Sequence, residues 1–419
     1  MMYCVWIVIN LGLVKYPFMK FKDLCLLVVG LLIIVGRVDR LAAKEGKEEG
    51  TRLYDSLLSK FPKEHQGFGL DAAQKPGLTE QPMTYALVLS SEAIHYRNDP
   101  NAESKLRIQK ALDWLITNQD LNHDGIPGWG LPLPWDAFSD GTINGPNHPY
   151  TITTSMVLNG FLDVLDAPNV ITNEQRYVIK ELIGKVMVHW CNHLWSKGYG
   201  GGYFWYSPNS WDNIFSINAP AMFLGSMSRF FKSYADTLSR SDYQLVESRA
   251  DDLAKAIVAT VKLRHGLPFW DYDPIPNKFN NRQVENDLVH QVYILWGIEL
   301  YRKNIGHVSL PWSTQQSLQS LRSYWYNNSL YGYPQDEKLN PKYSALLGVG
   351  AMIAFEAVYG THAEAKRCVE FLDKAYGPLP DLTLTPHRDT KRQPFYPRQA
   401  SHVLWGLSYY SFDNNTGNR

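Results

Sequence analysis

The feature that most constrains the fold is an alternation of two kinds of predicted helix, repeated six times after about residue 45. The first kind carries charge on one face, with Leu, Ile or Val recurring at every third or fourth position. Six segments have this character: 45–61, 103–119, 172–195, 241–264, 311–326 and 362–376. The second kind is almost without charge and rich in Gly, Ala and Ser, over 81–96, 150–165, 214–231, 287–302, 343–359 and 398–411. One helix of each kind makes a unit of about 55–73 residues.

This alternation predicts where each helix lies. A helix with one charged face lies at a surface, whereas a helix without charge can be buried on nearly every side. Both kinds bury their apolar faces if the uncharged helices form a ring inside the charged ones. We therefore predict an all-α fold, an (α/α)6 toroid of six helix pairs, for residues 44–419. An open solenoid of helix pairs is the alternative.

A closed ring also predicts the place of a site. Every loop from an outer to an inner helix then lies at the same end of the ring, where the inner helices begin. These loops would form the mouth of one central cleft, and side chains that carry chemistry are expected there.

Composition narrows the class of partner. The chain of 419 residues has 41 Lys and Arg and 41 Asp and Glu, so no net charge would attract nucleic acid. Aromatic residues make up 13%, with 13 Trp and 25 Tyr. Aromatic rings are a common surface for binding the faces of sugars, so we expect a polysaccharide or oligosaccharide partner.

The N-terminus, residues 1–43, reads as a signal peptide or membrane anchor. Two apolar runs cover residues 3–14 and 24–36, and a start at Met19 would give a basic head, a 13-residue apolar stretch and small residues. Arginines directly after the stretch favour an uncleaved anchor as the alternative. We therefore expect a periplasmic, secreted or membrane-anchored protein of the cell envelope, with membrane association through this segment.

Two cysteines, Cys191 and Cys368, lie in the predicted folded body. They are far apart in sequence, and two separate reduced thiols in the core are favoured over one disulfide bridge.

The second outer-to-inner loop suggests a metal. Asp120, Asn122, Asp124 and Gly125 have the oxygen spacing of the first half of a calcium loop. Position twelve is Leu131 where a bidentate Glu is expected, so an EF-hand is excluded and only a half-loop with an outside ligand remains. The alternative is a simple turn that ends the helix. No cofactor is required by the sequence, and Ca²⁺ is the one that it suggests.

Aromatic and polar side chains gather in the second and third of these loops, where they would surround a sugar. Candidate substrate-binding residues are Trp129, Trp135, Tyr150, Tyr203, Trp205, Trp211, Asp212 and Asn218. His148 and Tyr206 are candidates for moving a proton. The alternatives are packing of long loops, helix capping by His148, and a β-hairpin over the third segment.

The fourth loop is the densest in titratable groups. Candidate catalytic residues here are Asp271, Asp273, Glu285 and His290, with Arg282, Asn286 and Tyr293 as substrate ligands. A glycoside hydrolase needs two carboxyl groups, which Asp271 or Asp273 with Glu285 could supply. A lyase or epimerase acting on a uronic acid needs instead a base and a cation that neutralises the substrate carboxylate. For Asp287, helix capping is the plainer interpretation.

In the lyase or epimerase reaction the base would be His290, Tyr206 or His148. Arg398, Arg282 and Asn218 would hold the substrate carboxylate. The last loop is basic, and it adds Arg398 and His402 to the candidate substrate ligands.

Three segments carry a resemblance: "GGYFWYSPNSWDNIFSINAP", "ENDLVHQVYILWGIELY" and "YTITTSMVLNGFLDVL". They resemble bacterial cell-envelope polysaccharide-processing proteins with an (α/α)6 toroid. The helix with "SMVLNGF" also resembles the helical C-terminal domain of D-glucuronyl C5-epimerases, without the β-rich domains found there. The resemblance implies a glycan substrate and leaves the reaction open.

The leading hypothesis is a polysaccharide-modifying enzyme of lyase or epimerase type, acting on a uronic-acid-containing glycan. The alternatives are a glycoside hydrolase and a non-catalytic glycan-binding component of polysaccharide export or capsule assembly.

Overall fold

The computed structural model describes residues 48–71, 77–272, 285–335 and 342–412. The chain divides into two units, Met1–Glu48 and Glu49–Arg419, and the fold described below is that of the second. The predictions for residues 1–43, Asp273 and Arg282 lie outside the described residues. Among the helices of the described ranges, none combines the length and apolarity needed to cross a bilayer.

Twelve α-helices form in the described ranges, and they follow the predicted alternation. The outer helices are residues 49–58, α4 (Ala102–Thr117), α6 (Asn173–His193), α8 (Arg240–Ala259), α10 (Thr314–Arg322) and α12 (His362–Tyr376). The inner helices are α3 (Pro82–Asn98), α5 (Thr151–Asp166), α7 (Asn218–Ser233), α9 (Leu288–Asn304), α11 (Leu346–Tyr359) and α13 (Pro397–Phe412). The predicted helix pairs are therefore confirmed.

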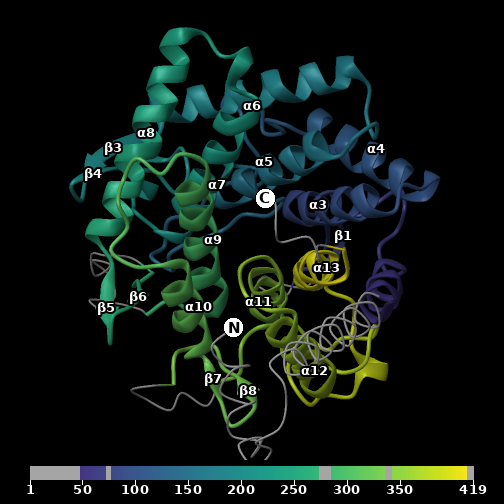
Figure 1. Cartoon of the computed structure of the whole chain (residues 1–419). Helices are drawn as coiled ribbons and strands as arrows, with labels where there is room; N and C mark the ends of the chain where they lie inside the picture. The colour runs from purple at the N-terminus through teal and green to yellow at the C-terminus, as the bar shows by residue number, and fades with distance from the viewer. Residues whose placement is uncertain (1–47, 72–76, 273–284, 336–341, 413–419) are drawn as a thin grey trace, which may run out of the picture. The chain divides into compact units, whose positions relative to one another are not determined.

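The inner helices close into a ring. Each of them packs against the next in chain order, and α13 packs against α3, the first. Figure 1 shows the six inner helices following one another around a closed circuit. An open solenoid would leave the first and last pairs apart, so the all-α toroid is confirmed and the solenoid was the wrong alternative.

Glycines explain how inner helices approach so closely. A Cβ atom on Gly297 of α9 would overlap the carbonyl of Ala221 on α7. A Cβ on Gly350 of α11 would likewise overlap the backbone of His402 on α13. Small residues thus let two backbones meet directly, which is why the inner segments are rich in them.

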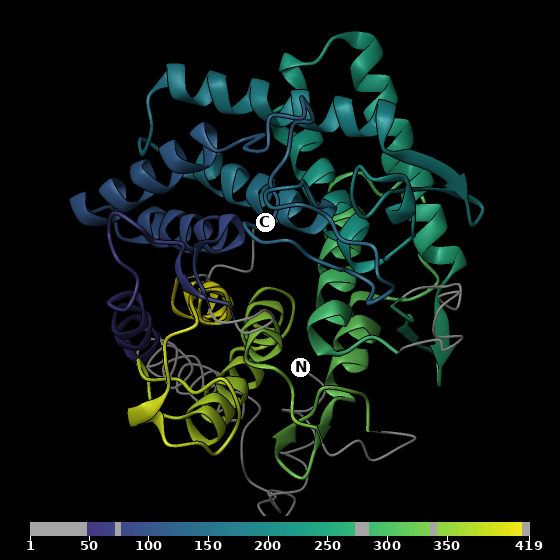
Figure 2. The same ribbon diagram turned by 180° about the vertical axis from the view of Figure 1, so that it is seen from behind.

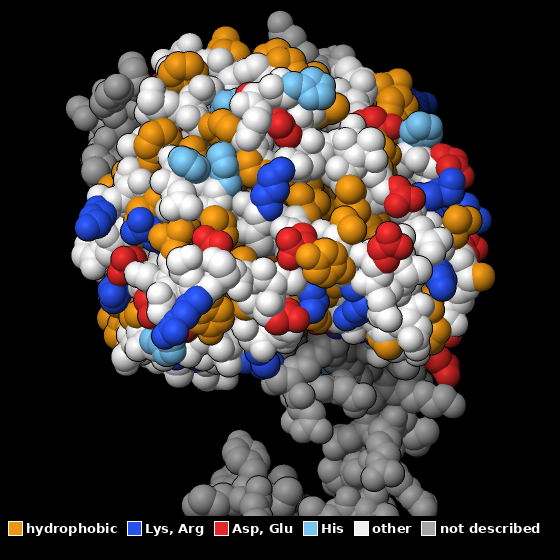
Figure 3. Space-filling model, turned by 90° about the horizontal axis from the view of Figure 1, so that it is seen from above, with side chains coloured by type: hydrophobic (Ala, Val, Ile, Leu, Met, Phe, Trp, Pro, Cys, Tyr) orange, Lys and Arg blue, Asp and Glu red, His pale blue; other side chains and the backbone are white. Residues whose placement is uncertain are grey.

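Several outer helices begin at defined capping residues. The side chain of Thr172 accepts a hydrogen bond from the backbone N–H of Gln175, whose side chain accepts one from the backbone of Thr172, making a capping box before α6. Ser313 and Gln316 form the same arrangement before α10. Lys and Arg are interspersed with Asp and Glu on the face drawn in Figure 3, as expected for a surface built from one-sided amphipathic helices.

Within the described ranges, four of the loops from an outer to an inner helix carry a two-stranded antiparallel hairpin. The hairpins are β1 (Phe68–Leu70) with β2 (Leu78–Glu80), β3 (Trp195–Gly198) with β4 (Gly201–Phe204), β5 (Lys262–Arg264) with β6 (Leu267–Phe269), and β7 (Trp325–Tyr326) with β8 (Ser329–Leu330). Two predicted helices end early for this reason. Helix α8 stops before β5 and α10 stops before β7, because the apolar residues that follow pair as strands.

The outer-to-inner loops meet at one end of the ring, which we call the loop end. The Thr151 N–H donates to the Tyr206 carbonyl, joining the second loop to the third at 3.0 Å. The Leu288 N–H donates to the Gly332 carbonyl at 2.9 Å, joining the fourth to the fifth. Figure 2 shows the extended connection between α4 and α5 from behind. The predicted gathering of these loops is confirmed.

Both cysteines of the described body are separate thiols. Cys191 and Cys368 are free and fully buried. Burial raises the pKa of each thiol above its ordinary value. The prediction of two core thiols is confirmed.

Candidate active site

Two inner helices bring titratable side chains together at the loop end. Asp287, His290 and Tyr293 follow one another at intervals of three residues at the start of α9, so they share one face of the helix. His402 lies in the early part of α13 and meets this face. The ring of His290 lies 6.3 Å from that of Tyr293, and the ring of Tyr293 lies 6.2 Å from that of His402.

Tyr293 and His402 form a buried hydrogen-bonded pair. The Tyr293 Oη and His402 Nε2 atoms are 2.5 Å apart, and His402 Nδ1 lies 2.7 Å from the carbonyl of Arg398. Because a carbonyl can only accept, Nδ1 carries the hydrogen and Nε2 accepts the phenolic proton of Tyr293. Burial lowers the pKa of His402 to about 4, so the imidazole is neutral at physiological pH.

Burial also raises the pKa of Tyr293 above its ordinary value, an effect that the Arg398 charge opposes. The phenol therefore keeps its proton at neutral pH. The nearby Arg398 charge favours the ionised form of the same phenol.

Asp287 and His290 form a second pair that faces outward. The Asp287 carboxylate lies 2.8 Å from His290 Nδ1 and also accepts the backbone N–H of His290 at 3.1 Å. It thus caps α9, as the plainer interpretation of this residue predicted. Burial alone raises the pKa of Asp287, but the interaction with His290 and the helix N–H groups outweighs burial and holds it below its usual range.

This geometry leaves one nitrogen of His290 for a substrate. Since a carboxylate accepts hydrogen bonds, Nδ1 carries a hydrogen, and in a neutral imidazole Nε2 is then the nitrogen with the lone pair. The His290 side chain retains 29% of its exposure, whereas Tyr293 retains 4% and His402 1%. Among the three rings of this group, His290 is therefore the most accessible.

Arg398 supplies the positive charge beside these pairs. Its Nη2 lies 3.1 Å from Asp71, a buried carboxylate in the first loop. Its Nε is shielded from solvent and has no acceptor among the residues that the structure describes. A guanidinium in this state can bind a further oxyanion without losing the ion pair that holds it.

Of the three carboxylates proposed for hydrolysis, the two that the structure describes, Asp271 and Glu285, are both neutralised. Asp271 and Glu285 face each other in an isolated antiparallel bridge. Lys262 forms an ion pair with Asp271, and Arg264 forms one with Glu285, both from β5. Asn286 is buried and donates to the Asp271 carbonyl at 3.1 Å. In the described part of this loop, each of these two carboxylates is therefore paired with a basic side chain.

An aromatic cluster occupies the second and third loops. The rings of Trp135 and Tyr150 lie 5.1 Å apart, and those of Tyr150 and Tyr206 lie 5.6 Å apart. Tyr150 and Tyr206 are buried, and burial raises the pKa of both phenols above their ordinary value. Trp129 is fully buried, with its Nε1 donating to the Leu115 carbonyl at 2.8 Å. These rings fill the loop end by packing mainly on one another.

A buried carboxylate ties the same two loops together. Asp212 accepts a hydrogen bond from Asn144 at 2.6 Å and one from Ser207 at 2.5 Å. Burial raises the pKa of Asp212. The neighbouring Trp211 keeps 48% of its exposure, with its indole N–H donating to Asn144. Trp211 is thus the most accessible of the tryptophans proposed to bind a sugar.

The remaining candidates of these loops are anchored in different ways. His148 Nδ1 lies 3.8 Å from Asp124, and burial lowers the pKa of His148. Tyr203 on β4 stacks on Phe215 at 5.1 Å, in the hairpin that was the alternative for this segment. The Trp205 indole donates to Ser196, and Asn218 is buried and accepts the N–H of Ala219 as α7 begins.

The proposed calcium half-loop forms a hydrogen-bonded turn. The Asp120 carboxylate accepts the N–H groups of Asp124 and Gly125, each at 3.1 Å, and Asn122 donates to Asp124. Burial and the nearby Asp124 raise the pKa of Asp120. Within the described ranges no cluster of three or more His, Cys, Asp or Glu side chains is arranged to hold a metal ion.

The same turn recurs further along the loop. Asp136 accepts the N–H groups of Asp140 and Gly141 at 3.1 and 2.9 Å. Asp140 then accepts the N–H of Thr142, as Asp124 accepts that of Ile126. Two segments of the form Asp-x-x-x-Asp-Gly therefore adopt one turn through their own carboxylates. These hydrogen bonds explain the oxygen spacing without a metal, and Ca²⁺ remains a proposal.

A cavity of about 780 Å³ lies at the opposite end of the ring, where the inner helices end. All six inner helices contribute residues to its walls from their C-terminal halves. The sequence predicted a cleft only at the loop end. The difference arises because the connections from inner to outer helices are short and leave this end of the ring uncovered.

Sequence reasoning missed several residues of the loop end. Asp71, Asn144, Lys262 and Arg264 each pair with a residue that it did select. A signal existed for the last two, because they alternate on a strand immediately before the acidic fourth loop. For Asp71 and Asn144 no local signal existed, because their partners come from other loops.

Fold and site together define an all-α toroid with a cluster of proton-moving groups where its inner helices begin. No protein-family model and no curated protein matches the chain by sequence. Several solved structures match it by fold. Cellobiose 2-epimerase from Bacillus thermoamylovorans has a TM-score of 0.58 at 11% identity, covering 86% of this chain and 98% of that one.

A reducing-end-xylose releasing exo-oligoxylanase has a TM-score of 0.53 at 14% identity, covering 89% of this chain and 93% of that one. A novel alpha-amylase from Clostridium perfringens has a TM-score of 0.56 at 11% identity, covering 85% of this chain and 96% of that one. These neighbours are carbohydrate-processing enzymes with an (α/α)6 toroid. At such low identities the likeness shows the fold, and the link to glucuronyl C5-epimerases has no counterpart among these structures.

Proposed function

We propose that the chain is a carbohydrate-active enzyme of epimerase or lyase type, acting on a uronic-acid-containing glycan at the loop end of the ring. The observation that carries this proposal is the pairing on α9 and α13. Asp287 orients an accessible His290 with a lone pair on Nε2, while His402 holds a protonated Tyr293 nearby. One group can take a proton and the other can give one.

In the proposed reaction, His290 and Tyr293 act on the same sugar residue of the substrate. His290 Nε2 takes the proton from C5 of the uronate, and the electron pair left at C5 delocalises into the substrate carboxylate. Arg398, through its free Nε, neutralises that carboxylate and stabilises the negative charge that develops. Asp287 stabilises the imidazolium that forms on His290.

Tyr293 completes either reaction. In an epimerase the Tyr293 hydroxyl returns a proton to C5 from the opposite face. In a lyase the C4–O4 bond breaks, its electron pair leaves on O4, and Tyr293 protonates that oxygen. The resulting phenolate is stabilised by Arg398, whose charge acts to lower the pKa of Tyr293. Proton exchange with water then restores His290 and Tyr293.

A glycoside hydrolase is the second candidate, because Asp271 and Glu285 lie directly opposite each other. It is less favoured, because hydrolysis requires one carboxyl group that holds its proton near neutral pH. In this structure Lys262 occupies the Asp271 carboxylate and Arg264 occupies that of Glu285, so neither faces a substrate unpaired.

A non-catalytic glycan-binding role in polysaccharide export or capsule assembly is the third candidate. It would use the aromatic side chains of the second and third loops, of which Trp211 is exposed, without turnover. A place in the cell envelope, and association with a membrane through residues 1–43, belong to the proposal as well.

One experiment separates these candidates. The purified chain is incubated with uronate oligosaccharides in D₂O, and the products are followed by NMR and by ultraviolet absorbance. Deuterium at C5 identifies an epimerase, and absorbance from unsaturated ends identifies a lyase. New reducing ends without either signal identify a hydrolase. Binding without any product supports the non-catalytic candidate and contradicts the proposed reaction.

A further inference from the structure

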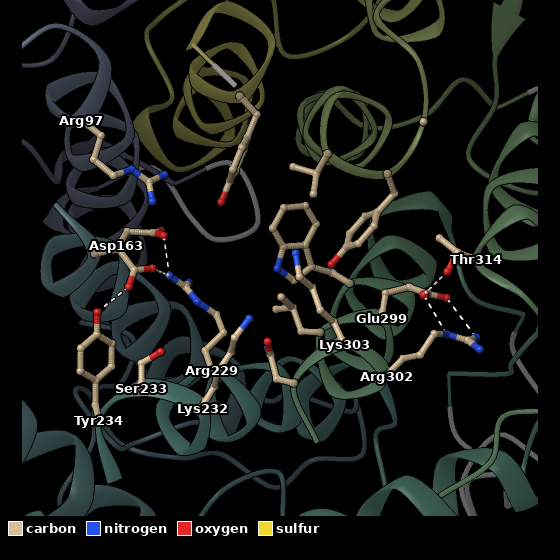
Figure 4. Close-up of a pocket in the computed structure, with 18 residues that line it drawn as sticks. Arg97, Asp163, Arg229, Lys232, Ser233, Tyr234, Glu299, Arg302, Lys303 and Thr314 are labelled. Carbon is tan, nitrogen blue, oxygen red and sulfur yellow. Dashed lines mark hydrogen bonds and ion pairs between the residues drawn. The ribbon is translucent and has the colours of Figure 1, made fainter. Parts of the chain in front are cut away.

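The cavity at the far end of the ring is a second feature that could bind a ligand. We call it the helix-end cavity. Its walls combine charged side chains with aromatic ones: Arg97, Asp163, Asp166, Arg229, Lys232, Trp296, Glu299, Arg302, Lys303, Tyr359 and Tyr409 are among them. Figure 4 labels charged side chains among them that come from α3, α5, α7 and α9, such as Arg97, Asp163, Arg229 and Glu299. Its volume of about 780 Å³ lies within the range of small-molecule sites.

The acidic side chains of this cavity are already neutralised. Arg229 Nη2 lies 2.8 Å from both Asp163 and Asp166. Glu299 accepts hydrogen bonds from Arg302 at 3.0 Å and from Thr314 at 2.7 Å. No wall carboxylate in the described ranges is therefore left to bind a cation.

Arg97 and Lys232 are wall cations that lie outside these pairs. Arg97, at the end of α3, has Nε and Nη2 shielded from solvent and without an acceptor among the described residues. Lys232, near the end of α7, forms no ion pair with any residue of the described ranges, and Figure 4 shows it directed into the cavity. A shielded guanidinium without an acceptor costs free energy, which a bound oxyanion would recover.

The aromatic side chains add a surface for a ring. Trp296 lies at the centre, with the Tyr359 ring 5.8 Å and the Tyr409 ring 5.5 Å from it. Burial raises the pKa of Tyr359 above its ordinary value, so its hydroxyl stays a hydrogen-bond donor. Rings arranged beside cations suit a sugar that carries an anionic group.

This cavity is separate from the candidate active site. Trp296 and Trp405 lie one helical turn beyond Tyr293 and His402, and their rings meet at 4.7 Å. The Trp296–Trp405 pair therefore stands between the two regions. No residue that lines the helix-end cavity belongs to the proton-moving group at the loop end.

We propose that the helix-end cavity binds a monosaccharide carrying a carboxylate or phosphate, with Arg97 and Lys232 as the cations available to the oxyanion and Trp296 supporting the sugar ring. This proposal does not depend on the proposed function, because the two sites share no residue. A ligand here would bridge the ends of several inner helices, and it would bind without being turned over.

The test is isothermal titration calorimetry on the full chain with D-glucuronate, glucose 6-phosphate and glucose. We expect binding of at least one of the two anionic sugars, which identifies a carboxylate or a phosphate as the ligand group. Glucose should bind at least tenfold more weakly. Equal binding of glucose would overturn the assignment of Arg97 and Lys232 to an oxyanion.

Matched variants locate the binding. Arg97→Gln should weaken it about tenfold or more, Arg97→Lys should weaken it less, and Lys255→Gln on the exposed face of α8 should leave it unchanged. Arg398→Gln removes the cation at the loop end and should also leave it unchanged. Binding lost in Arg398→Gln but kept in Arg97→Gln would overturn this proposal while supporting the proposed function. Circular dichroism of each variant checks that the ring is intact.

Discussion

At the loop end of α9, His290 and Tyr293 each have a hydrogen-bonding partner, whereas from the middle of the same helix to its C-terminal end Trp296 and Lys303 line a cavity. The difference follows from the connections. Outer-to-inner loops are long, as in residues 118–150, and their aromatic side chains fill the space above the ring. Inner-to-outer connections are as short as residues 360–361 and cover little.

The comparison suggests how one ring of helices can support two kinds of site. Where long loops fold over the helix starts, side chains become paired and desolvated, which fixes protonation states for chemistry. Where short connections leave the helix ends open, the ring interior remains accessible as a cavity. The following predictions test whether the two ends differ in this way.

The largest expected effect is on turnover at the loop end. We expect His290→Gln to lower kcat/KM by about 10²- to 10⁴-fold, because the accessible base is removed while the fold is kept. Turnover of uronate oligosaccharide measures this. His123→Asn, in an exposed turn, is the matched control and should keep full activity. A fully active His290→Gln would remove this residue from the proposed mechanism.

At the cavity end the largest effect should be on stability. Arg229→Met leaves the buried Asp163 without its cation, so we expect the free energy of unfolding to fall by about 3–5 kcal/mol. Urea denaturation measures the change. Lys255→Met breaks an exposed ion pair with Asp252 and should change little. An equally small effect in Arg229→Met would show that its charge network does not hold the cavity walls.

The pairing of His402 predicts a dependence of stability on pH. Burial lowers its pKa from 6.5 to about 4, so the unfolded chain binds this proton more readily. The contribution of His402 is fully present above pH 6.5 and is lost as the pH falls towards about 4, by about 3 kcal/mol in total. Urea denaturation of wild type and His402→Gln across this range should show a difference that shrinks on acidification. A difference independent of pH would mean that His402 is not buried as a neutral group.

The smallest effect should come from Arg97. Because two of its nitrogens have no acceptor among the described residues, Arg97→Gln should change the free energy of unfolding by less than about 1 kcal/mol, towards higher stability. Thermal denaturation without ligand measures this change in stability. A marked loss of stability would show that Arg97 has a structural partner and would weaken its assignment to a ligand.

Much of the fold was predictable from the sequence because charge and period act locally. The amphipathic segment 362–376 coincides with α12, because the polar or apolar type of each residue indicates which face of the helix is exposed. The hairpins that shorten α8 and α10 were harder, because Lys262 and Trp325 continue a helical pattern and pair as strands only with residues beyond a turn.

The site was predictable in its residue types and less so in its pairings. The spacing of Asp287, His290 and Tyr293 places them on one face of α9 from sequence alone. That Tyr293 meets His402, more than a hundred residues away, depends on the ring closing in a particular register. Periodicity also could not show that Trp129 is buried while Trp211 is exposed, because both stand in loops.

The most direct test of the account compares solvent exchange in wild type and Asp287→Asn. The substitution keeps the Oδ1 atom that caps α9 and accepts the hydrogen on His290 Nδ1, but it removes the negative charge that would stabilise the imidazolium formed on His290. With a uronate oligosaccharide in D₂O, we predict C5 deuteration or unsaturated ends in wild type, and a loss of about 10²-fold or more in the variant at unchanged stability. Equal rates in the two proteins, or reducing ends as the only product, would contradict the proton-transfer site at the loop end.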